Sequence, residues 1–154
     1  MNSAAFLDPD LVFSLASKLA VLGWLALAVS PFQSRWSPAA RFAAGRVLPL
    51  MFAVVYVVLF ATTGMGEGGY DSLAAVQRLF SVPSLLAAGW LHFLAFDLFV
   101  GAWIAGRAGL LGIPHMVVLP LLALTFLFGP AGLLAFAVVR AAGWVRRRPQ
   151  TVPA

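Results

Sequence analysis

The sequence contains no cysteine, and only 10% of its 154 residues are charged. Without cysteine the chain can form no disulfide, no thiolate nucleophile and no iron–sulfur or cysteine–zinc site. Acidic residues are especially scarce, with five Asp and Glu against ten Lys and Arg, for a formal net charge of +5. Most of the arginines flank apolar segments, so we expect the positive charge to meet lipid headgroups and expect no nucleic acid as a partner.

Hydrophobic residues make up 62% of the sequence, far above the share in ordinary soluble domains. Four apolar segments are long enough to cross roughly 30 Å of hydrocarbon at about 1.5 Å per residue. They cover residues 10–30, 45–63, 83–105 and 114–140. Because the connections are short, the sequence predicts an all-α protein, with residues 1–154 forming a single integral membrane domain built as a four-helix bundle. The expected location is a bacterial inner membrane or an equivalent membrane, with the lipid bilayer as a partner.

Two local features modify this four-span prediction. Residues 73–80 carry apolar side chains at helical spacing opposite polar ones, which indicates a short interfacial helix before the third span. The last segment contains Pro120 and Gly129-Pro130, so we expect at least one kink there, because proline removes backbone hydrogen bonds. In a four-span topology, four arginines would lie on one side of the membrane and five on the other, so the orientation in the membrane stays undetermined.

An ionisable residue at membrane depth is costly and usually faces a partner, a cavity or a substrate path. The third predicted span holds two such residues, His92 and Asp97. They are five positions apart, about 140° around a helix, so they occupy different faces and each needs its own partner. Depth in an antiparallel bundle brings Lys18 and Thr125 within reach, while Trp90 and Phe93 supply apolar walls.

Each of these residues has a structural alternative to its functional role. Asp97 is a candidate general acid or ligand contact, or a structural partner of Lys18 or Thr125. His92 is a candidate base or orienting group, or it hydrogen-bonds a neighbouring helix. Lys18 is a candidate substrate contact, or its ammonium reaches interfacial water.

A metal site is a further alternative. Two histidines, His92 and His115, with one carboxylate make the right inventory for a non-haem iron centre, so iron is the one cofactor that the residues suggest. In the predicted bundle, however, the two histidines differ in depth by about 15 Å or more.

Residues 78–136 contain a set of motifs that resembles a known family. They read Phe80-Ser81, Trp90-Leu-His92, Asp97-Leu-Phe99, Gly112-Ile-Pro-His115 and Leu124-Thr-Phe-Leu-Phe-Gly-Pro130 followed by Gly132. Together they resemble the membrane proteins related to the plant abscisic-acid-deficient-four protein, and the first two helices resemble that family only in their layout. The sequence departs from the family pattern in having Ala102 and Trp103 where relatives carry an arginine, and Pro83 near an acidic position.

The plant relative is required to form neoxanthin from violaxanthin. The resemblance therefore implies a carotenoid or related isoprenoid as substrate or ligand, and it marks His92, Asp97 and His115 as motif positions. The leading hypothesis is a membrane enzyme that isomerises or rearranges an isoprenoid end group by acid–base chemistry, with oxidative cleavage as a variant. The alternative is a non-enzymatic pigment-binding or assembly protein, for which a homo-oligomer is one open arrangement.

Overall fold

The computed structural model describes residues 8–143, and this part of the chain is helical, with no strand. Three helical segments are long and apolar enough to cross a membrane. They are α1 (Pro9–Ala28), the continuous segment Ser37–Thr63 and α5 (Pro83–Leu110). The second segment comprises α2 (Ser37–Phe42), a π-helical turn η2 (Ala43–Val47) and α3 (Leu48–Thr63). The first three predicted spans are therefore present as helices.

Local sequence signals explain where these helices begin and end. At the start of α1, the Asp8 carboxylate accepts a 3.0 Å hydrogen bond from the Asp10 amide, and Pro9 occupies the first helical position. The α3 helix ends at Gly64, whose φ of 67° favours glycine. The predicted short helix before the third span is present as α4 (Leu73–Phe80), capped by the Ser72 hydroxyl.

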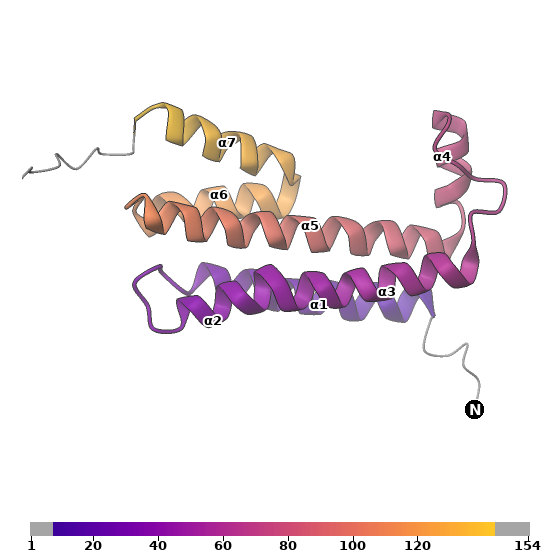
Figure 1. The fold of residues 1–154 in the computed structure, drawn as a ribbon, viewed down its shortest axis with the longest axis horizontal. Helices are drawn as coiled ribbons and strands as arrows, with labels where there is room; N and C mark the ends of the chain where they lie inside the picture. Colours follow the sequence, from indigo (N-terminus) through magenta and orange to yellow (C-terminus); the bar gives the residue numbers. More distant parts are fainter. Residues whose placement is uncertain (1–7, 144–154) are drawn as a thin grey trace, which may run out of the picture.

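The central helix of the fold is α5. It packs against α3, α1 and the helix that follows it, and half of its most apolar stretch is buried, against 28% for α1 and 22% for Ser37–Thr63. Figure 1 shows α1 and α5 running in the same direction, with α3 antiparallel to both. Side chains on α5 are therefore the ones that a buried site would use.

The predicted fourth span over residues 114–140 is not confirmed, because these residues form two shorter helices. They are α6 (His115–Phe128) and α7 (Pro130–Ala141), which run antiparallel as a hairpin, called here the C-terminal hairpin (Figure 1). The chain reverses at Gly129, whose φ of 45° few other residues adopt, and Pro130 then starts α7 without needing an amide donor. Pro120 lies inside α6 without interrupting it. The expected kink is thus a complete reversal.

The length of the C-terminal hairpin determines how much of α5 it covers. The 14 residues of α6 extend about 21 Å, whereas the 28 residues of α5 extend about 42 Å. Because α6 runs back along α5 from the far end, its tip reaches the level of Phe96 and Asp97, about half-way. The remaining half of that face of α5 is not covered by the hairpin (Figure 1).

The two ends of the molecule differ in charge. One end, called here the acidic end, comprises the start of α1, the α3–α4 connection and α4, with Asp8, Asp10, Glu67 and Asp71 beside a single arginine, Arg78. The opposite end, called the arginine end, comprises the α1–α2 and α5–α6 connections and the end of α7. Its described charged residues are Arg35, Arg41, Arg46, Arg107 and Arg140. The arginines at 146–148 lie outside the described residues.

Candidate functional site

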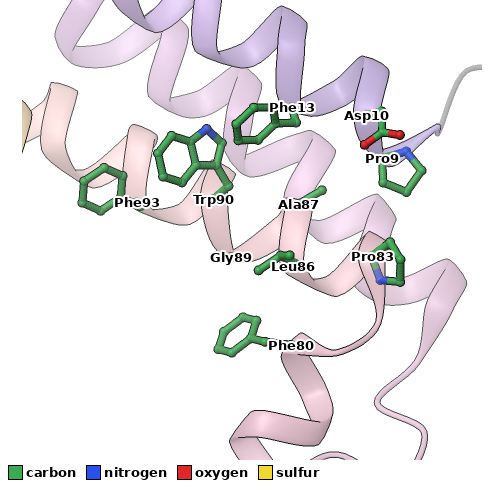
Figure 2. Close-up of a pocket in the computed structure, with 10 residues that line it drawn as sticks. All are labelled: Pro9, Asp10, Phe13, Phe80, Pro83, Leu86, Ala87, Gly89, Trp90 and Phe93. Atoms are coloured by element: carbon green, nitrogen blue, oxygen red, sulfur yellow. The ribbon is translucent and has the colours of Figure 1, made fainter.

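A pocket opens between α1, α4 and α5 at the acidic end (Figure 2). Its volume of about 510 Å³ falls in the range of small-molecule pockets. The lining is almost entirely apolar, and comprises Pro9, Asp10, Phe13, Phe80, Pro83, Leu86, Ala87, Gly89, Trp90 and Phe93. This pocket lies beside the half of α5 that the C-terminal hairpin leaves uncovered.

Aromatic rings form one wall of the pocket. The ring of Trp90 lies 5.3 Å from that of Phe13 on α1 and stacks 5.3 Å from that of Phe93 (Figure 2). The indole nitrogen of Trp90 donates a 2.9 Å hydrogen bond to the hydroxyl of Ser17. Trp90 is therefore fixed between α1 and α5, and it presents a rigid apolar surface to whatever occupies the pocket.

The amphipathic helix α4 contributes the opposite wall through Phe80. Figure 2 shows the Phe80 ring reaching from α4 towards Gly89 on α5. A Cβ atom at Gly89 would lie 2.6 Å from a Phe80 ring carbon, closer than carbon atoms approach one another. Glycine at position 89 therefore lets the Phe80 ring lie against α5 and close this side of the pocket.

Asp97 lies deeper, where the tip of the C-terminal hairpin meets α5. Only 9% of the residue is exposed, and its Oδ2 atom is buried without a hydrogen-bond partner. A Cβ at Gly129 would lie 2.8 Å from Asp97 Oδ1, so the carboxylate packs directly against the chain reversal. Gly129 immediately precedes the first turn of α7, and a helix N-terminus favours negative charge. The hairpin tip thus gives this carboxylate a polar backbone neighbour inside an apolar protein.

Neither expected partner contacts the Asp97 carboxylate. Lys18 lies on the exposed side of α1, whereas Asp97 lies on a buried face of α5. The hydroxyl of Thr125 donates a 2.7 Å hydrogen bond to the Leu121 carbonyl within α6. Thr125 is instead part of the packing inside the hairpin, where a Cβ at Gly132 would lie 2.5 Å from the Thr125 backbone nitrogen. The predicted pairing of Asp97 with Lys18 or Thr125 is therefore wrong.

Trp90, Phe93 and Asp97 share one face of α5, because their spacing of three and four residues follows the helical repeat. Asp97 is four residues beyond Phe93, about 6 Å further along the helix. The pocket lining ends at Phe93. An aromatic surface therefore extends along α5 from the acidic end towards the buried carboxylate. Asp97 lies next to the pocket but does not line it.

His92 lies on a different face of α5, as its five-residue spacing from Asp97 indicates. Its imidazole is exposed, stacks 4.6 Å from the ring of Phe96 and lies 6.0 Å from that of Tyr56 on α3. The structure therefore places His92 in an aromatic cluster on the outer side of α3 and α5, apart from the pocket and from Asp97.

His115 is at the arginine end, where its Nε2 donates a 2.8 Å hydrogen bond to the carbonyl of Ala28 and joins α6 to the end of α1. From His92 to Leu110 alone the chain advances about 27 Å along α5. Within residues 8–143, no three side chains from His, Cys, Asp and Glu are grouped as metal ligands. The predicted iron set of His92, His115 and a carboxylate therefore does not fit the described donors.

Sequence reasoning missed Phe13, Phe80 and Gly129 as site residues. Phe80 belonged to the amphipathic pattern of residues 73–80, but that pattern does not show which way α4 folds relative to α5. Gly129-Pro130 was visible as a helix interruption, yet a kink and a reversal share the same two residues. The reversal is what brings Gly129 to Asp97.

Residues 11–136 match the family model described as ABA DEFICIENT 4-like. Because this match covers most of the chain, the chain belongs to the ABA DEFICIENT 4-like family. It is a multi-pass membrane protein with apolar helices. No curated protein and no solved structure matches it significantly. The resemblance seen in residues 78–136 is confirmed, and it extends into the first helix.

Proposed function

We propose that this protein is a membrane-embedded enzyme that binds a carotenoid or related isoprenoid in the pocket between α1, α4 and α5, with Asp97 as its catalytic residue. The observation that carries the proposal is the shared face of Trp90, Phe93 and Asp97 on α5. Apolar rings form the wall of the pocket, and a buried carboxyl oxygen without a partner lies about 6 Å further along the same face.

The shape of the fold favours a long apolar ligand at this place. The C-terminal hairpin covers only about half of one face of α5, so the other half offers a site that a fourth crossing helix would have filled. A polyene lying there would contact the rings of Phe13, Trp90 and Phe93, and its end group would point along α5 towards the hairpin tip. Dispersion contacts with these rings would supply most of the binding free energy.

The single carboxyl group of Asp97 can supply both proton transfers of an isomerisation or end-group rearrangement. Such reactions need no net proton, because a proton added at one atom is balanced by one removed at a neighbouring atom. A carboxyl group can donate the proton from one oxygen and accept one at the other. His92 lies on a different face of α5, so it takes no part in this proton transfer. No step of the reaction is assigned to a metal.

The second candidate function is non-enzymatic binding of the same ligand. The observation that favours it is that the pocket lining stops at Phe93, so a ligand confined to the pocket does not reach Asp97. In this case pigment would be retained in a fixed ratio to protein, and no product would form.

Pigment extraction from carotenoid-producing bacteria separates the two functions. Cells express the wild-type protein, Asp97→Asn or Asp71→Asn, the last being a matched loss of an exposed carboxylate at the acidic end. The enzymatic proposal predicts a new chromatographic peak with the wild type and Asp71→Asn but not with Asp97→Asn. Unchanged chromatograms with pigment retained on the purified protein would favour binding, and unchanged chromatograms without retained pigment would contradict both.

We also propose that α1, Ser37–Thr63 and α5 cross a bacterial inner membrane or an equivalent one, with the arginine end in the cytoplasm. The support is the charge distribution, because five described arginines stand at that end against Arg78 at the other. The cysteine-free sequence allows single-cysteine variants to test it. Membrane-impermeant maleimide should label Glu67→Cys in intact cells and should label Gln33→Cys only after lysis, and the reverse pattern would overturn the orientation.

A further inference from the structure

A second groove lies at the arginine end, between the α2–η2 segment and α5, far from the aromatic pocket. Its volume is about 750 Å³. Three arginines line it, Arg41, Arg46 and Arg107, together with apolar residues. The apolar part of the lining comprises Pro38, Phe42, Gly45, Phe99, Ala102, Trp103, Gly106 and Leu110. The groove therefore combines a positive rim with an apolar floor.

The local backbone brings the arginines to this groove. Arg41 and Arg46 are five residues apart, which would place them about 140° apart on a regular α-helix. The π-helical turn η2 contains one extra residue per turn, with the Leu48 amide bonding the Ala43 carbonyl, and it rotates Arg46 back towards Arg41. Arg107 faces them from α5. The irregular turn thus creates the cluster.

Contacts within the protein hold one guanidinium in place without neutralising it. Arg41 donates to the hydroxyl of Ser37, and its guanidinium carbon lies 4.7 Å above the ring of Phe32. The Arg41 side chain also lies next to Gly106 of α5, where a Cβ atom would be in ordinary van der Waals contact, 3.5 Å from Arg41 Cδ. These contacts orient Arg41 and leave its charge available to an anion.

Among residues 8–143, no carboxylate is placed to pair with these arginines. The chain has five acidic residues, of which four are at the acidic end. The fifth, Asp97, is ten residues from Arg107, about 15 Å along α5. The described part of the chain therefore supplies no anion to balance this groove.

We infer that this groove binds an anionic phospholipid, with its phosphate among Arg41, Arg46 and Arg107 and its acyl chains along Phe99, Ala102 and Trp103. Arginine recognises phosphate through paired hydrogen bonds, and a polar rim above an apolar floor matches the headgroup and tail of a lipid. Phe99 is eight residues from Arg107, so the apolar floor extends about 12 Å from the arginines into the membrane-crossing part of α5.

The test is retention of lipid by protein released from nanodiscs that contain equimolar phosphatidylglycerol and phosphatidylcholine, measured by native mass spectrometry. The wild type is expected to retain phosphatidylglycerol about tenfold more than phosphatidylcholine. Arg107→Gln should reduce this preference about fivefold, whereas Arg35→Gln, an exposed arginine at the same end outside the groove, should leave it unchanged.

Gly106→Leu gives an independent readout, because it keeps every arginine and fills the groove. It is expected to abolish the preference for phosphatidylglycerol. Equal retention of both lipids by the wild type, or equal losses with Arg35→Gln and Arg107→Gln, would overturn the inference. Unchanged retention of phosphatidylglycerol by Gly106→Leu would also overturn it, because it would show that the lipid does not lie in this groove.

Discussion

The contact between Gly129 and Asp97 predicts a specific cost for adding one methyl group at the hairpin tip. Gly129 has a φ of 45° and a ψ of −97°, a conformation that only glycine adopts readily, and forcing it on an alanine costs about 1–3 kcal/mol. The new Cβ would also lie 2.8 Å from Asp97 Oδ1, and relieving an overlap of this kind costs about 1–3 kcal/mol. Gly129→Ala should therefore lower the free energy of unfolding by about 2–6 kcal/mol.

Gly112→Ala is the matched control. Gly112 also has a positive φ, 71°, but a Cβ there would meet nothing within 4 Å. It should cost only the backbone term of about 1–2 kcal/mol. Gly112→Ala therefore measures the cost of a positive φ where no new contact is made.

The measurement is reversible unfolding in mixtures of mild detergent and sodium dodecyl sulfate, followed by circular dichroism. In an Asp97→Ala background the carboxylate is gone, so Gly129→Ala should cost about 1–3 kcal/mol less there than in the wild-type background. If Gly129→Ala costs the same in both backgrounds, the hairpin tip does not pack against Asp97.

Two further predictions concern the pocket and the hairpin. Trp90→Ala should reduce the amount of pigment retained on the purified protein about tenfold, because a ring fixed against the ligand is lost. Trp36→Ala at the arginine end should leave pigment retention unchanged. Equal retention by both variants would show that Trp90 is not part of the site. Gly132→Ala should destabilise the protein by about 2 kcal/mol or more in the same unfolding assay. Thr125→Ala should rescue it only in part, since it removes the overlap with the Thr125 hydroxyl but not the overlap with the Thr125 backbone nitrogen, and full rescue would show that only the side chain is in the way.

Much of the fold follows from composition and periodicity. Continuous apolar runs predicted the three long helices, and the amphipathic pattern of residues 73–80 predicted α4. The prediction of a fourth span failed because the hydrophobicity of residues 114–140 is the same whether they form one long helix or a hairpin. What separates them is the backbone of Gly129, and a φ of 45° at one residue leaves no hydropathy signal.

Part of the candidate site could also be predicted from helical periodicity. The spacing of Trp90, Phe93 and Asp97 depends only on the repeat of one helix, so their common face could be read directly. Partners on other helices could not be, because they depend on how each helix is rotated about its own axis. Lys18 was matched to Asp97 by depth alone, and the structure turns it to the exposed side of α1.

The side of the membrane on which α7 ends decides between the C-terminal hairpin and a fourth crossing helix, and the position of Gly129 beside Asp97 depends on the hairpin. Ala142→Cys and Gln33→Cys, each the only cysteine in its variant, are treated with membrane-impermeant maleimide in intact cells and after lysis. We expect both to be protected in intact cells and labelled after lysis. Labelling of Ala142→Cys in intact cells while Gln33→Cys stays protected would mean a fourth crossing, and would contradict the account.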